Sequence, residues 1–166
     1  MRFKWQRLGF TVLLLLFLLG LGWVLQSKRI VEESSFTTLT GESITWPSLR
    51  GGPVLVAFWA TDCPSCIAEI PHLLELYRRY HRQGLEIIAI AMYYDPPSHV
   101  VAMTKSNQLP YPVVLDLDGR HARAFGDVNL TPTTLLIDRD GNVVSRTTGL
   151  MDQSDMSARI EQLLKG

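Results

Sequence analysis

The sequence predicts an α/β domain with a mixed central sheet and an N-terminal β-hairpin, preceded by a single transmembrane helix. Three observations support this fold class. A long apolar run without charges lies near the N-terminus, buried strands alternate with helical periodicity in the middle of the chain, and a hairpin signal followed by an amphipathic helix ends it. A chain of 166 residues is long enough for one such domain and a short appendage.

The apolar run extends from Leu8 to Leu25 and, as a helix, would span roughly 27 Å, close to the ~30 Å core of a bilayer. Basic residues flank it, and the short segment before it favours an N-terminus in the cytoplasm. We therefore expect residues 1–27 to form a cytoplasmic stub and an anchor, residues 28–35 a tether, and residues 36–166 the folded domain. A cleaved signal peptide and a cytosolic core helix are the alternatives.

The charge balance does not favour a nucleic-acid or acidic partner. Lys plus Arg and Asp plus Glu balance at 16 each, so the net charge gives no reason to expect binding to nucleic acid or to an acidic partner.

The first elements of the domain follow from turn residues and hydrophobicity. Residues 36–39 and 44–46 flank a turn that contains Gly41, which predicts the N-terminal hairpin. After a Gly-Gly-Pro break, residues 54–59 form an unbroken apolar run rich in strand formers, which is typical of a strand buried on both faces.

Helical spacing then predicts a helix over residues 64–81, ended by Gly84, with its apolar positions at Ile67, Ile70, Leu73, Leu74 and Tyr77. A second buried strand is expected at residues 85–92. Strand, helix and strand in this order predict two parallel neighbouring strands.

The rest of the chain continues the α/β pattern. We expect a helix at 98–107, a strand at 113–115, a short helix at 119–125, a β-hairpin of strands 133–138 and 142–146, and a closing amphipathic helix at 152–164.

The two cysteines, Cys63 and Cys66, are the only ones in the chain, and they lie where the strand at 54–59 gives way to a helix. At that position the sulfur of Cys63 would lie near the first free amides of the helix, which favour negative charge. Because the thiolate is the nucleophile in disulfide exchange, this position would activate Cys63. Pro64 suits the first helical turn. Cys66, one turn further and less exposed, could resolve a mixed disulfide on Cys63.

Other roles for such a pair remain open at this stage. Zinc usually needs four ligands, and the four histidines at 72, 81, 99 and 121 are scattered, so we expect no metal site. Copper binding by an exported thiol pair is an alternative. A purely structural disulfide is another, although so short a loop removes little entropy from the unfolded chain.

The residues around the pair resemble a known family. Phe-Trp-Ala-Thr-Asp-Cys-Pro-Ser-Cys at 58–66 is similar to the active site of thioredoxin-fold proteins, and Pro71 matches the proline in their active-site helix. Leu-Thr-Pro-Thr at 130–133 resembles the loop that carries their cis-proline. The segments at 41–53 and 132–141 resemble the membrane-anchored TlpA/ResA-like branch. The resemblance covers about residues 36–165.

This resemblance implies a thioredoxin-like three-layer fold and a thiol-disulfide oxidoreductase without a cofactor. Cys63 would attack and Cys66 would resolve, while Thr131 and Pro132 would hold the extended backbone of the substrate. A cis bond at Pro132 is expected, since X-Pro bonds have a small cis penalty; an ordinary trans turn is the alternative.

The resemblance also implies partners and a location. The partners would be exported proteins with disulfides or thiols and a membrane electron donor such as a thiol-reducing transporter. The domain would lie in the periplasm, held on the bacterial inner membrane. The substrates stay open between cytochrome c maturation, disulfide repair and assembly of metal centres.

Glu69 is the candidate proton acceptor. It follows Cys66 by three residues and so shares its helical face. In the TlpA/ResA-like branch an acidic residue at this position lies near the cysteines, and a carboxyl group with a raised pKa could take the proton of Cys66. A solvated surface glutamate is the alternative. His72 continues the same face, and for it we favour a role without chemistry.

Two positions depart from the family pattern. Ala57 replaces the buried aspartate of thioredoxin, which strengthens the case for Glu69. Asp62 replaces the tryptophan expected before the first cysteine, and its carboxylate would oppose a thiolate on Cys63 by like-charge repulsion. We expect this to make the dithiol form less stable and the pair more reducing.

Two other functions are compatible with this fold. A peroxide-reducing relative would place Thr or Ser three residues before its reactive cysteine, where this chain has Ala60. A copper-binding assembly chaperone would space its cysteines by three residues and add a distal histidine, and His121 is not obviously placed for that.

Overall fold

The computed structural model describes residues 35–165. The predicted anchor at 1–27 and most of the predicted tether at 28–35 lie outside this range. None of the helices within the described range is long and apolar enough to cross a membrane.

A five-stranded mixed sheet forms the centre of the domain, in the order β5-β4-β3-β6-β7. Strands β3, β4 and β5 are parallel, whereas β6 and β7 run antiparallel to their neighbours. The strands are β3 (Val54–Trp59), β4 (Glu86–Ala91), β5 (Val113–Leu115), β6 (Thr133–Ile137) and β7 (Val143–Thr148). The predicted mixed sheet with a parallel core and a C-terminal hairpin is confirmed.

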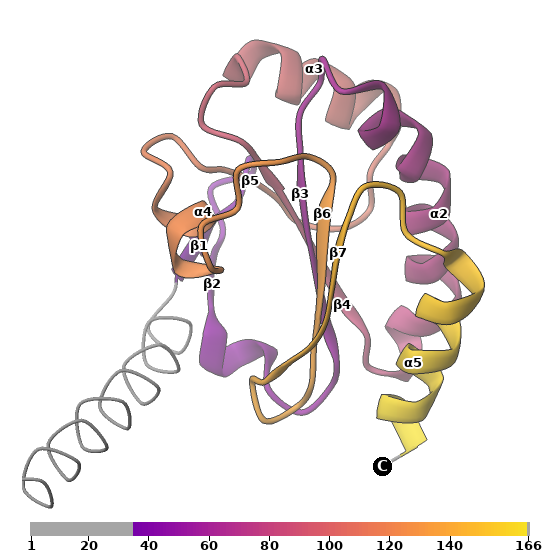
Figure 1. Ribbon diagram of the computed structural model, residues 1–166. Coiled ribbons are helices and arrows are strands. Elements are labelled where there is room, and N and C mark those ends of the chain that lie inside the picture. The colour runs from indigo at the N-terminus through magenta and orange to yellow at the C-terminus, as the bar shows by residue number, and fades with distance from the viewer. Residues whose placement is uncertain (1–34, 166) are drawn as a thin grey trace, which may run out of the picture.

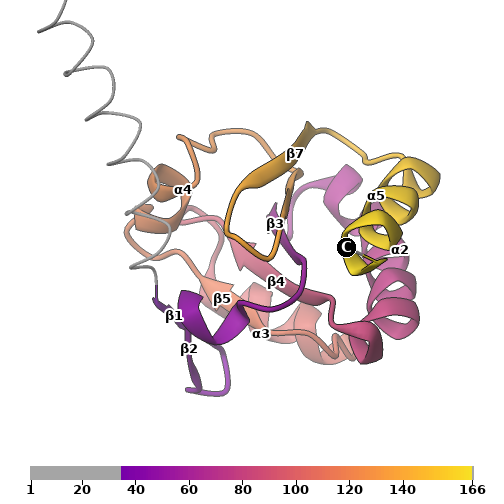
Figure 2. The ribbon, with the colours of Figure 1, turned by 90° about the horizontal axis from the view of Figure 1, so that it is seen from below.

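Helices cover both faces of this sheet (Figures 1 and 2). One face packs against α2, α3 and α5, around a core that includes Leu73, Val100 and Ile160. The α-helices are α2 (Pro64–Tyr80), α3 (Pro97–Ser106), α4 (Arg120–Ala124) and α5 (Gln153–Lys165). The result is the three-layer arrangement that the sequence predicts.

The opposite face is covered by α4 and by the N-terminal segment. Phe36, Trp46 and Phe125 pack there in an aromatic cluster. This N-terminal segment contains the hairpin of β1 (Ser35–Thr37) and β2 (Ser43–Thr45) and a 3-10 helix, η1 (Trp46–Leu49). A single bridge from Thr38 to Val114 joins it to the outer edge of β5.

The predicted elements are all present, but several bounds were wrong. Trp46, expected in a strand, begins η1 instead, because Pro47 at the second helical position has its φ angle fixed in the helical range. The helix predicted to reach residue 81 ends at Tyr80 and passes into a second 3-10 helix, η2 (His81–Gln83). Gly84 then ends the helical segment with a φ of 109°, which is unfavourable for any residue with a Cβ atom.

Ile67 differs from the other apolar positions predicted for this helix. It has helical spacing with the buried residues of α2, yet 43% of its surface is exposed. Cys66, the residue before it in the first turn of α2, is only 2% exposed, so helical spacing alone does not predict which side chains are buried here.

Strand β3 is fully buried. All six of its residues are buried, and it lies between β4 and β6 in the middle of the sheet. The turn that follows its C-terminal end is therefore attached to the centre of the fold. The cysteines follow that end.

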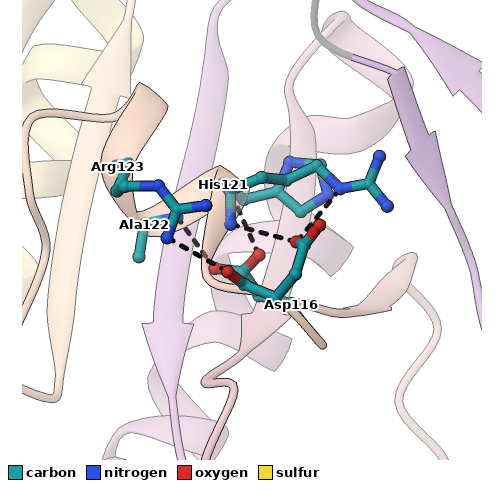
Figure 3. A network of polar contacts seen from close by, with 6 residues as sticks. Asp116, His121, Ala122 and Arg123 are labelled. Carbon is teal, nitrogen blue, oxygen red and sulfur yellow. Dashed lines mark hydrogen bonds and ion pairs between the residues drawn. The ribbon is translucent and has the colours of Figure 1, made fainter.

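A buried carboxylate after β5 caps the start of α4. Asp116 follows β5 and accepts hydrogen bonds from the backbone N–H groups of His121 (3.0 Å) and Ala122 (2.8 Å) at the start of α4 (Figure 3). The position preceding α4 is Gly119, which has no side chain to cap it. Asp116 thus supplies the acceptors that the first turn of a helix needs.

Candidate active site

Cys63 and Cys66 form a disulfide, with their Cα atoms 5.2 Å apart. Cys63 is the N-cap residue of α2, and its sulfur accepts a hydrogen bond from the backbone N–H of Cys66 at 3.2 Å. The predicted position of this sulfur at the first helical amides is confirmed. Cys63 is half-buried and Cys66 is only 2% exposed, so a partner in solution can reach the first sulfur more easily than the second.

The local sequence explains this geometry. The chain leaves β3 at Trp59 and turns, and the Cys63 N–H bonds to the carbonyl of Ala60 at 3.3 Å. Pro64 then occupies the first helical position, where its missing N–H has no partner to lose. Pro71 lies inside α2, two residues after the buried Glu69.

The Thr131–Pro132 peptide bond is cis, as the resemblance implies, and the alternative of a trans turn is wrong. Strand β6 begins one residue later, with Thr133 opposite Phe58 of β3. This register brings Pro132 next to Trp59, where the cysteine turn starts. The Pro132 carbonyl accepts a hydrogen bond from the Gly149 N–H at 2.8 Å, which ties the loop to the end of β7.

Glu69 is buried, with 2% of its surface exposed, so the alternative of a solvated glutamate is wrong. One carboxyl oxygen accepts a hydrogen bond from the Met151 N–H at 3.0 Å, and the other accepts one from the Thr134 hydroxyl at 3.4 Å. Burial raises the pKa of Glu69, while these two hydrogen bonds and the nearby His72 partly offset that rise.

His72 lies one helical turn beyond Glu69 and is half-buried. Its Nδ1 atom is buried and has no hydrogen-bond partner within residues 35–165. Its positive electrostatic effect on Glu69 links it to the site. Asp62, in contrast, is exposed to solvent immediately before Cys63.

Three residues near the disulfide were missed by sequence reasoning. Ser65 lies inside the motif, and its hydroxyl is 3.4 Å from the Cys63 sulfur. Asp95 accepts two hydrogen bonds from Thr61, and the Tyr94 hydroxyl lies 3.4 Å from that of Thr131. A signal for the last two existed: the carboxyl ends of parallel strands meet at one edge of a sheet, and the segment after β4 ends in Tyr94 and Asp95.

Across residues 35–165 there is no group of three or more His, Cys, Asp or Glu side chains arranged to hold a metal ion.

Comparison with known proteins places this geometry in a family. The family model described as Redoxin matches residues 27–164. The chain belongs to the Redoxin family.

Several relatives of this Redoxin-family chain are named for thiol-disulfide chemistry. It is 33% identical over 172 residues to the thiol-disulfide oxidoreductase ResA of Geobacillus thermodenitrificans, an alignment that covers 96% of this chain and 98% of the relative. It is 33% identical over 155 residues to ResA of Bacillus subtilis, covering 87% and 86% of the two chains. Among solved structures, a thiol:disulfide interchange protein of Chlorobium tepidum superposes with a TM-score of 0.72 and 28% identity over 79% of this chain and 92% of that one.

These relatives and the Cys63–Cys66 pair identify the Redoxin-family chain as a thiol-disulfide oxidoreductase of the TlpA/ResA-like type. Its substrates are proteins with thiols or disulfides.

Proposed function

We propose that this oxidoreductase reduces or exchanges disulfides of exported proteins, with Cys63 as the attacking residue and Cys66 as the resolving one. The observation that carries this assignment is the asymmetry of the pair. Cys63 is half-buried at a helix N-terminus and accepts a backbone hydrogen bond, whereas Cys66 is almost fully buried behind it. The first has access and a stabilised thiolate, and the second is shielded until a mixed disulfide forms.

The exchange proceeds in two steps. The Cys63 thiolate attacks one sulfur of the substrate disulfide, and the other substrate sulfur leaves as a thiolate with the bonding electrons. Cys66 then attacks the Cys63 sulfur, which forms the Cys63–Cys66 disulfide and releases the second substrate thiolate. Two electrons pass from the protein to the substrate.

Glu69 takes the proton of the Cys66 thiol in the second step. Burial raises its pKa, which brings its carboxylate closer in basicity to a thiol than an exposed glutamate would be. Its position three residues after Cys66 on one helical face supports this role. The bonds from Met151 and Thr134 hold the carboxyl group in one orientation.

The substrate binds as an extended segment against the backbone of Thr131 and Pro132. Exposed apolar side chains adjoin these residues in the chain: Ile67 follows Cys66, Leu130 precedes Thr131, and Leu150 follows Gly149, whose N–H bonds to Pro132. Clustered exposed apolar side chains are typical of a surface that contacts another protein.

Asp62 biases the pair toward reduction. It is exposed beside Cys63, and its negative charge opposes the thiolate that the helix terminus stabilises. A less stable thiolate makes the dithiol form a stronger reductant.

The domain acts outside the cytoplasm, on the bacterial inner membrane. The charge-free run within residues 1–27 supports an anchor, and residues 28–35 tether the domain to it. A membrane electron donor, such as a thiol-reducing transporter, returns the pair to the dithiol state, because each reduction of a substrate leaves it oxidised.

A trapping experiment tests the exchange mechanism. In Cys66→Ser the resolving thiol is lost, so mixed disulfides between Cys63 and substrate proteins accumulate and can be identified by non-reducing electrophoresis and mass spectrometry. Cys63→Ser is the matched control, and we expect it to form no mixed disulfides at position 63. If the exported, folded Cys66→Ser protein forms no mixed disulfides, the exchange mechanism is wrong.

A further inference from the structure

Asp95 is a buried carboxylate that the exchange chemistry above does not use. It is 5% exposed and lies four residues after the end of β4. One of its oxygens accepts a hydrogen bond from the Thr61 N–H at 2.7 Å, and the other accepts one from the Thr61 hydroxyl at 2.6 Å. Hydrogen bonds to charged groups are stronger than neutral ones, so this two-point contact is a firm attachment.

The contact joins two segments that approach the active site separately. Thr61 lies in the turn between β3 and α2, two residues before Cys63. Asp95 lies in the segment between β4 and α3, which we call the β4–α3 loop (residues 92–96). The two strands stop side by side, since Trp59 pairs with Ala91. Beyond that pair, the Met92 N–H still bonds to the carbonyl of Trp59 at 3.0 Å.

The β4–α3 loop also reaches the proline loop. The hydroxyl of Tyr94 is 3.4 Å from that of Thr131, the residue before the cis bond. Tyr93 and Tyr94 are 60% and 47% exposed, and their rings contact each other edge to face at 5.4 Å. Side chains of one loop thus connect the Cys63 turn on one side with the substrate-binding loop on the other.

We propose that Asp95 is a positioning residue for disulfide exchange with peptide and protein substrates, and that Tyr94 is the substrate-contacting side chain of the β4–α3 loop. Asp95 fixes the Cys63 turn relative to Thr131, through Thr61 on one side and the neighbouring Tyr94 on the other. This inference rests on the proposed exchange function, because it concerns the register between the attacking sulfur and the bound substrate backbone.

The physical reason is the geometry of thiolate attack. The attacking sulfur must approach along the axis of the disulfide that breaks, and small displacements from a near-attack arrangement slow such reactions strongly. A peptide held on Thr131 has its disulfide fixed in space, so Cys63 must be in register with it. A small free disulfide can adjust its own position and needs only a reactive thiolate.

Two disulfide probes with one chromophore separate these cases. The first is a short extended peptide whose cysteine is disulfide-bonded to thionitrobenzoate, and the second is 5,5′-dithiobis(2-nitrobenzoate). In both, Cys63 forms a new disulfide and thionitrobenzoate leaves as the coloured thiolate; Cys66 then closes the Cys63–Cys66 disulfide and releases the remaining thiol. The rate of colour release is followed by stopped flow on the reduced full-length protein.

Three variants each remove one group from the contacts that link the Cys63 turn, the β4–α3 loop and Thr131. Thr61→Val removes the hydroxyl but keeps the N–H bond, Asp95→Asn removes the charge at nearly constant shape, and Tyr94→Phe removes only the hydroxyl that faces Thr131. We expect each to lower the second-order rate with the peptide probe by about tenfold, and the rate with the small probe by less than about twofold. Thr61→Ser keeps the hydroxyl and is expected to restore the peptide rate.

Matched controls carry the same chemical changes elsewhere. Thr37→Val lies on an exposed position of β1, and Asp140→Asn lies in the β6–β7 turn. Neither should change either rate. Equal losses with both probes in the three variants, or unchanged peptide rates, would overturn the positioning role. If the unsubstituted reduced protein releases no chromophore from either probe, it is the proposed exchange function that fails.

Discussion

At the scale of single residues, Glu69 shows how burial makes a carboxyl group useful for proton transfer. Burial raises its pKa above the ordinary value of 4.5 by disfavouring the charged form, and three neighbours limit the rise. Because the folded protein holds this proton more tightly than the unfolded chain does, ionisation of Glu69 opposes folding. The carboxylate form of Glu69, which can accept a proton, therefore lowers the stability of the folded protein.

This sign gives a prediction for Glu69→Gln. As the pH rises from 4.5 through the raised pKa, the free energy of unfolding of the unsubstituted protein should fall, by at most about 1.4 kcal/mol per pH unit from this group. Glutamine can accept the Met151 N–H bond with its amide oxygen and donate its NH2 group to the Thr134 hydroxyl oxygen, so it keeps both contacts without the charge and should lose this slope. Urea unfolding from pH 4 to 9 measures it, with Glu42→Gln at an exposed position as control. Identical pH profiles for variant and parent would contradict the assignment.

The same substitution should slow resolution. Without the Glu69 carboxylate, the Cys66 thiol must lose its proton to water, so we expect the decay of a preformed mixed disulfide on Cys63 to slow by about 10²-fold near neutral pH. The rate should recover as the pH approaches the pKa of the thiol. Quenched-flow sampling of the mixed disulfide follows this decay, and an unchanged rate would remove Glu69 from the mechanism.

Asp62 gives a second prediction at this scale. Replacing it with the tryptophan of related sites removes a negative charge beside Cys63, so Asp62→Trp should lower the pKa of the Cys63 thiol and raise the reduction potential of the pair. Thiolate absorbance against pH and equilibration with a glutathione buffer measure the two quantities. Asp62→Asn separates the effect of charge from that of size, and the hypothesis fails if both quantities stay constant in both variants.

At the scale of secondary structure, α4 depends on a carboxylate outside itself. The helix has five residues, too few to be stable alone, and the Gly119 before it cannot cap it. Asp116, which is 1% exposed, supplies both acceptors from the end of β5 (Figure 3). The short helix is thus fixed by a contact that connects it to the sheet.

Asp116→Ala should therefore destabilise the fold. It leaves two buried N–H groups without acceptors, and we expect a loss of about 2–3 kcal/mol in the free energy of unfolding. Asp118→Ala is the control: this residue also contacts the start of α4, but in an exposed position, and should lose clearly less stability than Asp116→Ala. Urea denaturation of the two variants measures the difference, and equal losses would show that burial of the cap is unimportant.

At the scale of the whole molecule, the fold gathers its reactive groups at one edge of the sheet. The buried strand β3 ends at the cysteine turn, β4 ends at the loop with Tyr94 and Asp95, and β6 begins after Pro132. Cys63 at this edge is half-buried and Tyr94 is 47% exposed, so a protein substrate can reach both side chains.

The proposed anchoring makes a prediction about topology. Because Cys63 and Cys66 are the only cysteines of the chain, a membrane-impermeant maleimide added to reduced spheroplasts should label the full-length protein in the membrane fraction. The Cys63→Ser/Cys66→Ser double variant gives the background. Labelling only after lysis would contradict a domain outside the cytoplasm, and labelled protein in the soluble fraction would indicate a cleaved leader.

How much of the fold the sequence predicts depends on the length of each element. The apolar run of β3 and the helical spacing of α2 extend over enough residues for their periodicity to be unambiguous, and both elements were predicted. The 3-10 helix η1 was missed, because four residues carry almost no periodic signal and Trp46 continued the pattern of the preceding strand. Ile67 has the spacing of the buried face of α2 and yet is exposed, because spacing identifies a helical face but not which of its positions are covered in the fold.

The sequence by itself determined the chemistry of this protein. Short motifs in the chain identify the two cysteines at a strand-to-helix turn and the proline before the last hairpin. Only the tertiary structure decided the surroundings that tune them. Glu69 is buried by Thr134 and Met151, and Thr61 is held by Asp95, through contacts that span 65, 82 and 34 residues of sequence. Packing of the layers sets such contacts, and no local pattern records which distant side chains will meet.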